Sequence, residues 1–130
     1  MDDPIVVMLR ELLPDIPVGD GVHWGIETAD LDVNVVHLDP LSRVETHLNL
    51  EVDIVILVLE GSGWIWLGDD EHRLGPHALA LAPRGIARSI AAGRDGITYV
   101  SMHRRRSPLS IRHASQDERG SGSVDEPTRG

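Results

Sequence analysis

The run Ile54–Leu59, with the sequence IVILVL, is apolar at every position and ends just before the turn Gly61–Gly63. A strand with one face in water alternates apolar and polar side chains, so this run predicts a strand that is covered on both faces. A histidine-bearing stretch, Thr46–Asn49, precedes it. We therefore expect the rest of the chain to be arranged around these residues.

Short apolar segments separated by turn residues continue on both sides of this run. Thr28–Asp30, Asp39–Pro40 and Gly68–Asp70 are the clearest turns. About nine short strands with turns every eight to twelve residues are typical of an all-β sandwich or jelly roll. The predicted strands are Val22–Glu27, Leu31–Leu38, Val44–Asn49, Ile54–Leu59, Trp64–Leu67, His72–Leu74, Ala78–Leu81, Ala87–Ala91 and Ile97–His103.

The two ends of the chain differ from the strand region. At the N-terminus, Asp3 and Pro4 resemble a helix start, and apolar residues then recur at helical spacing until Pro14. We expect a short helix and connector over residues 1–21, a barrel over 22–106 and a flexible polar tail over 107–130, where apolar residues almost disappear. Residues 1–106 would form a single domain.

Composition excludes several classes of function. The net charge of −9 disfavours nucleic acid as a partner, and the basic run His103–Arg106 is more typical of a solvated strand end. The absence of cysteine excludes disulfides and thiolate metal sites. No apolar run approaches the roughly 20 residues that span a bilayer, so we expect a cytoplasmic protein with no membrane contact. No phosphate-binding glycine loop or nucleophile elbow is present.

The stretch from Leu41 to Gly61 resembles the first motif of the cupins, Gly-x5-His-x-His-x4-Glu-x6-Gly. In this frame Leu41 takes the place of the first glycine, and Gly61 matches the last. The two histidine positions hold His47 and Asn49, and the glutamate position holds Ile54.

The stretch HALALAPRGIARSIAA resembles the second cupin motif, Gly-x5-Pro-x-Gly-x2-His-x3-Asn. His77 takes the glycine position, Pro83 and Gly85 match, Arg88 takes the histidine position and Ala92 the asparagine position. Together the two motifs cover residues 41–92. The resemblance implies a cupin double-stranded β-helix, or jelly-roll barrel, with a short N-terminal helix and a disordered C-terminal tail.

Metal-binding cupins hold a divalent metal with three imidazoles and a carboxylate, and the resemblance places His47, Asn49, Ile54 and Arg88 at those positions. An amide is a poor donor, isoleucine has none, and arginine is a permanent cation. We therefore predict no metal cofactor. The alternative is a divalent transition metal held by a displaced set, His47, Asn49, Asp53 and His103.

Two functions from different classes follow from the resemblance. The first is a non-catalytic module that binds a small carboxylate or other anion. The second is a cupin enzyme, dioxygenase- or isomerase-like, that uses a metal or uses His47 as a metal-free acid or base. The predicted pocket residues are His47, Asn49, Ile54, Ile56, Val58, Arg88, Tyr99 and His103. The alternatives are a structural His47 bonded to Asn49 and a solvent-facing Arg88 paired with an acidic neighbour.

We also expect a homodimer. In the cupin frame Ile65 and Leu67 face the barrel, so Trp64 and Trp66 face outward. Two outward indoles and a short apolar helix need a surface to cover them, and a two-fold interface centred on the tryptophans would do so.

Overall fold

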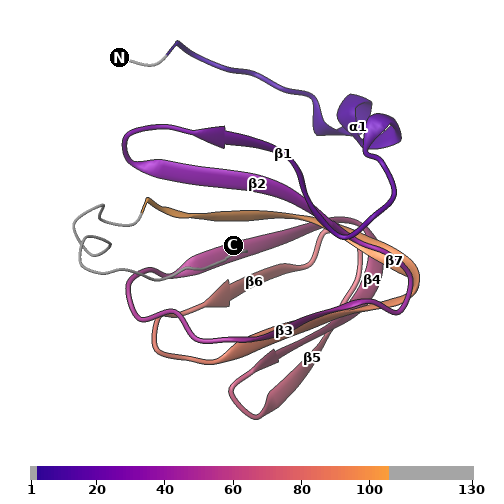
Figure 1. The fold of residues 1–130 in the computed structure, drawn as a ribbon, viewed down its shortest axis with the longest axis vertical. Helices are drawn as coiled ribbons and strands as arrows, with labels where there is room; N and C mark the ends of the chain where they lie inside the picture. Colours follow the sequence, from indigo (N-terminus) through magenta and orange to yellow (C-terminus); the bar gives the residue numbers. More distant parts are fainter. Residues whose placement is uncertain (1–2, 106–130) are drawn as a thin grey trace.

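The computed structural model describes residues 3–105 and is built mainly from antiparallel strands (Figure 1). The all-β prediction is confirmed, and the predicted tail over 107–130 lies outside the described residues. None of the helices within residues 3–105 has the length and hydropathy that a membrane crossing requires. In chain order the elements are α1 (Leu9–Leu12), a 3-10 helix η1 (Leu13–Asp15), β1 (Gly21–Glu27), β2 (Leu31–Leu38), β3 (Arg43–His47), β4 (Ile54–Leu67), β5 (Asp70–Leu74), β6 (Leu79–Ala82) and β7 (Arg88–Arg104).

The strands β4 and β7 are the longest and belong to two facing layers. They pair with each other from Ile54↔His103 to Leu67↔Arg88, with register shifts on either side of Glu60. In Figure 1, β1 and β2 lie in one layer, β3 and β5 lie in the other, and β4 and β7 turn from one layer to the other. The sequence predicted two separate strands in each case. In the structure each pair is one continuous strand, β4 or β7. The glycines at each bend remain within the strand, and bulges there turn its direction.

The core lies between the two layers. Along β4, Ile54, Ile56 and Val58 are at most 2% exposed, whereas Val55 and Leu57 are half-buried. The prediction that both faces of this run are covered is therefore correct for the inner face only. Within residues 3–105, β4 is flanked in the sheet by β6 and β7 along this run.

Among residues 3–105, two residues that are not glycine have left-handed backbone conformations. Leu41 has φ 65° and His77 has φ 72°. These are the two positions at which the cupin motifs carry their first glycine, so the backbone keeps the conformation that the motif requires although the residue has changed. A left-handed conformation costs a residue with a Cβ roughly 1–2 kcal/mol. This agreement supports the register in which both motifs were placed.

The N-terminal helix is shorter than predicted. Residue Met8 is still extended, with φ −87° and ψ 100°, and α1 begins at Leu9 with no side-chain hydrogen bond at its cap. The β-branched run of residues 5–7 favours an extended backbone, which overrides the helix-start signal at Asp3 and Pro4. Pro14 lies inside η1 rather than after the helix.

Candidate ligand-binding cavity

A cavity of about 510 Å³ lies between the two layers. Its walls come from both layers, because β2 and the second half of β7 face β3 and the first half of β7. The aliphatic part of the wall consists of Val36, Leu38, Val44, Ile56 and Ile90. A volume of this size is within the range of small-molecule sites, and such sites combine an apolar wall with a few polar groups.

Arg88 brings a permanent positive charge to this cavity. It is the first residue of β7 and lies across the ladder from His47 on β3 and Leu67 on β4. Its side chain lines the cavity, and the residue is only 8% exposed. A guanidinium carries five N–H donors in a planar fork, a geometry that matches carboxylates.

Tyr99 lines the same cavity as Arg88 and is also buried, at 5% exposure. Burial raises the pKa of the Tyr99 phenol to about 12, although the positive charge of Arg88 partly offsets this rise. The phenol is therefore protonated at neutral pH and can donate a hydrogen bond into the cavity.

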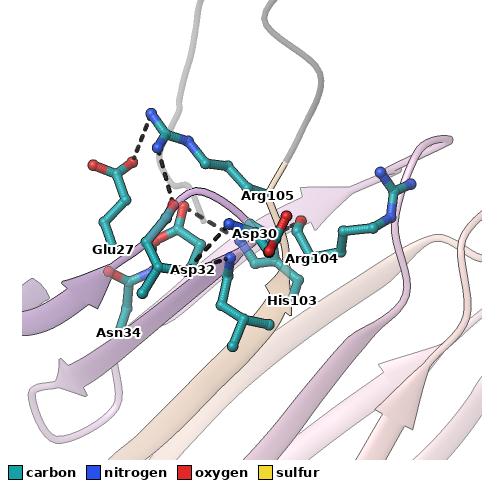
Figure 2. A network of polar contacts seen from close by, with 9 residues as sticks. Glu27, Asp30, Asp32, Asn34, His103, Arg104 and Arg105 are labelled. Carbon is teal, nitrogen blue, oxygen red and sulfur yellow. Dashed lines mark hydrogen bonds and ion pairs between the residues drawn. The ribbon is translucent and has the colours of Figure 1, made fainter. Parts of the chain in front are cut away.

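A polar row continues along the same face of β7 beyond Tyr99. Ser101 and His103 line the cavity and pair with Asn34 and Asp32 of β2. Figure 2 shows the end of this row, where His103 Nε2 lies 3.9 Å from Asp32 Oδ2 and the Asn34 amide donates to Asp32 Oδ1 at 3.4 Å. His103 Nδ1 lies 2.9 Å from the Arg104 carbonyl oxygen. A carbonyl oxygen can only accept, so Nδ1 carries a proton.

Solved structures show which known fold this arrangement belongs to. A protein from Bacillus halodurans superposes with a TM-score of 0.71 at 15% identity, covering 81% of this chain and 83% of its own. A cupin-2 domain containing protein from Shewanella frigidimarina gives 0.63 at 17% identity, covering 77% and 95%. The chain has the cupin fold. KdgF from Halomonas sp. gives 0.60 at 20% identity, covering 66% and 78%. No protein-family model and no curated protein matches the sequence.

Half of the predicted pocket residues line the cavity of this cupin barrel. They are Ile56, Arg88, Tyr99 and His103. The other four are not among its lining residues. Ile54 and Val58 belong to the hydrophobic core, and His47 is a half-buried neighbour of Arg88 in the ladder.

Asn49 has a structural role instead. The predicted strand Val44–Asn49 ends at His47, so Asn49 belongs to the loop before β4. Its side-chain oxygen accepts hydrogen bonds from the backbone N–H groups of Glu51 and Val52, at 2.8 and 3.1 Å. The side-chain oxygen therefore holds the loop, whereas the amide nitrogen Nδ2 is buried and has no hydrogen-bond partner among residues 3–105.

Sequence reasoning missed several polar residues of the wall, among them Asp32, Asn34 and Ser101. The alternation of Asp32 and Asn34 with Val33 and Val35 is visible in the sequence. The alternation alone does not reveal which set faces the barrel. The valines on the outer face are themselves half-buried or buried, so an outward position does not require a polar residue there. In the register of β2 with β7, the polar set faces inward.

The residues at the cupin metal positions do not fit a metal. Arg88 places a guanidinium beside His47 in the ladder, and the Asn49 oxygen already accepts two backbone hydrogen bonds. The displaced set fits no better, since Asp53 is exposed and accepts a hydrogen bond from the Arg84 backbone N–H at 2.9 Å. Within residues 3–105, no three histidine or acidic side chains are placed to hold a metal ion.

Trp64 and Trp66 lie on the outer face, as the cupin frame predicts, because Ile65 between them is 1% exposed. Both indoles are half-buried. The guanidinium of Arg73 lies 5.6 Å from the ring of Trp64, and that of Arg43 lies 5.4 Å from the ring of Trp66. These cation–π contacts cover part of the indole surface. The dimer interface at the two tryptophans stays a prediction.

The raised pKa of Tyr99 can be measured directly, because the chain has one tyrosine. We expect tyrosinate absorbance of the folded protein to rise with a midpoint at about pH 12 instead of 10. Since the folded pKa is the higher one, stability is unaffected below pH 10 and falls from there to pH 12, by about 3 kcal/mol in total. Urea unfolding at pH 8 and pH 11 checks the second effect. An absorbance midpoint near pH 10 in the folded protein would contradict the buried phenol.

Proposed function

We propose that the cavity is a binding site for a small organic carboxylate and that no metal takes part. The observation that carries this proposal is that a buried guanidinium and a protonated phenol line the same largely aliphatic cavity. In this proposal Arg88 takes the carboxylate as a bidentate partner, and Tyr99 donates a further hydrogen bond to one of its oxygens. The carbon chain of the ligand lies against the aliphatic wall.

Electrostatics favours a carboxylate over a neutral ligand. Arg88 is only 8% exposed, so its charge interacts more strongly with an anion than it would at the surface. Hydrogen bonds between a guanidinium and a carboxylate are shorter and roughly twice as strong as neutral ones. Phosphate or sulfate would satisfy the same donors, but the aliphatic wall favours an anion that carries a hydrocarbon chain.

A second candidate function is metal-free acid–base catalysis, with His103 in place of His47. This candidate rests on the orientation of His103, whose protonated Nδ1 donates to the Arg104 carbonyl, so that Nε2 is directed toward Asp32. An imidazole held in this way can exchange a proton with a bound ligand. A ligand recovered unchanged by NMR after prolonged incubation, with no exchange of its carbon-bound hydrogens into deuterated water, would favour the binding module.

Calorimetric titration of the wild-type protein with hexanoate and with hexanamide tests the proposed function. The two probes have the same shape and differ in charge. We expect hexanoate to bind about tenfold or more tightly than hexanamide, since a charged hydrogen-bonded pair contributes about 1.5–3 kcal/mol. Dialysis against a chelator should leave both affinities unchanged. Equal affinity for the two probes, or binding that the chelator abolishes, would contradict the proposal.

A further inference from the structure

Three polar residues of the cavity wall lie at the open side of the barrel. Both β4 and β7 turn at their glycines, so the two ends of each strand lie on the same side of the barrel, opposite the bends (Figure 1). Arg88 begins β7, and His103 lies near the other end of β7, where it pairs with Asp32 of β2. Arg88, Asp32 and His103 therefore share the open side.

The lining of the cavity changes from polar to aliphatic between the open side and the bends. On β2 the lining residues run, from the open side inward, Asp32, Asn34, Val36 and Leu38. On β7 they run Arg88, Ser89 and Ile90 from the start of the strand, and His103, Ser101 and Tyr99 from its end. A ligand in the cavity is therefore expected to hold its charged groups at the open side and its carbon chain toward the bends.

Two charged lining residues near the bends are bound elsewhere. Asp20 is exposed, and its Oδ1 accepts a hydrogen bond from the Asp39 backbone N–H at 2.8 Å. The guanidinium of Arg43 lies 5.4 Å from the ring of Trp66, which is on the outer face. These contacts leave the open side as the place where a ligand meets charge.

Asp32 keeps capacity for hydrogen bonds from a ligand. Its Oδ2 lies 3.9 Å from His103 Nε2, beyond hydrogen-bond distance, and the bond from Asn34 to Oδ1 is long at 3.4 Å (Figure 2). Asp32 forms no ion pair with Arg88 or with any other arginine among residues 3–105. A carboxylate ion has sites for about four hydrogen bonds, so Asp32 can accept further bonds from a cation.

Ser101 offers a buried hydroxyl between Asp32 and the aliphatic wall. It is 5% exposed and lines the cavity, and its hydroxyl makes no hydrogen bond with any other residue in the range 3–105. Buried side-chain polar atoms nearly always have a partner. The hydroxyl of Ser101 is therefore placed to bind a polar group of a molecule held in the cavity.

We propose that the ligand is an aliphatic 2-amino carboxylate, in which the ammonium is carried by the carbon next to the carboxylate. This inference rests on the proposed function, since it assumes that Arg88 and Tyr99 hold the carboxylate. The ammonium then donates hydrogen bonds to the carboxylate of Asp32 and the hydroxyl oxygen of Ser101. The hydrocarbon chain extends along the aliphatic wall toward the bends.

A zwitterion matches the charges of the open side better than a plain carboxylate does. Arg88 and Asp32 carry opposite charges at the same side of one cavity and are not paired with each other. A plain carboxylate is attracted by Arg88 but repelled by Asp32, whereas a neighbouring ammonium turns that repulsion into attraction. An ammonium at the far end of the chain would lie against the aliphatic wall, where burying a charge is costly.

Calorimetry with matched probes tests this inference on the folded full-length chain. The probes are hexanoate, the two enantiomers of 2-aminohexanoate, 2-hydroxyhexanoate and 6-aminohexanoate. We expect at least one enantiomer of 2-aminohexanoate to bind about tenfold more tightly than hexanoate. The hydroxy acid, which has one donor and no added charge, should gain less. The terminal amine of 6-aminohexanoate should weaken binding below that of hexanoate.

A variant at Asp32 checks which residue holds the ammonium. In Asp32→Asn the ratio of the affinities for 2-aminohexanoate and hexanoate should fall to about one or less, because the charge that favours the ammonium is gone. Asp69→Asn, in the exposed turn before β5, removes a carboxylate that does not line the cavity and should keep the wild-type ratio.

The outcomes separate this inference from the proposed function. If hexanoate binds but neither enantiomer of 2-aminohexanoate has an advantage, or the hydroxy acid gains as much, or the advantage survives in Asp32→Asn, the 2-amino ligand is wrong and the carboxylate site stands. The wild-type ranking decides this point even if Asp32→Asn fails to fold. If no probe binds, both proposals are overturned.

Discussion

Replacing Arg88 with methionine is expected to lower the affinity of the cavity for hexanoate by about 30-fold or more. Methionine keeps much of the side-chain volume but removes the charge and all five donors. Removing one partner of a buried charge pair costs about 2–5 kcal/mol of binding free energy, which is the basis for this magnitude. Calorimetric titration measures the loss, and circular dichroism checks the fold.

Arg94→Met is the control for this prediction, because Arg94 is exposed and does not line the cavity. Its affinity for hexanoate should match that of the wild-type protein. Arg88→Met should be at least as stable as the wild-type protein without ligand, since replacing a buried charge by an apolar group is often neutral or stabilising. Unchanged hexanoate affinity in Arg88→Met would remove Arg88 from the site.

Replacing Gly61 with alanine is expected to lower the free energy of unfolding by about 3 kcal/mol or more. Gly61 has φ 82°, and a Cβ there would collide with the backbone oxygen of Gly96 and lie 2.8 Å from the Cα of Ile97. The collision is with backbone of β7, which is paired with β4 at this bend, so neither strand can move away freely. Thermal unfolding should show a midpoint lower by about 10 °C or more.

Gly75→Ala is the matched control for this substitution. Gly75 has no left-handed φ, and no atom lies within 4 Å of a Cβ built there. We expect it to unfold within about 0.5 kcal/mol of the wild-type protein. If Gly61→Ala were as well tolerated as Gly75→Ala, the bend of β4 would not depend on the close approach of the two backbones.

The fold could be predicted from the sequence because its signals are local. The alternation within β2, the continuous apolar run of β4 and the turns between strands report directly on strand positions. The motif register is supported by Leu41 and His77, whose left-handed backbones replace motif glycines. The bends of β4 and β7 were not predicted, since a glycine-rich segment signals a turn equally well whether the ladder ends there or continues through a bulge.

The candidate site was less predictable because it depends on pairing between distant strands. The motif frame assigns Arg88 to the inner face, and Arg88 lines the cavity. Asp32 and Ser101 were missed because only the register of β2 with β7 turns both toward the cavity. Asn49 was assigned to the pocket by the frame, but β3 ends two residues earlier and its amide oxygen is bound by the loop backbone.

A crystal structure of the protein with hexanoate, prepared after dialysis against a chelator, tests the central claim most directly. We predict ligand density in the cavity, with the carboxylate oxygens about 2.7–2.9 Å from the guanidinium nitrogens of Arg88 and the Tyr99 hydroxyl within hydrogen-bond distance. The carbon chain should lie along the wall formed by Val36, Ile56 and Ile90. A carboxylate bound away from Arg88 would contradict the claim, as would hexanoate binding that appears only when a metal ion occupies a site at His47.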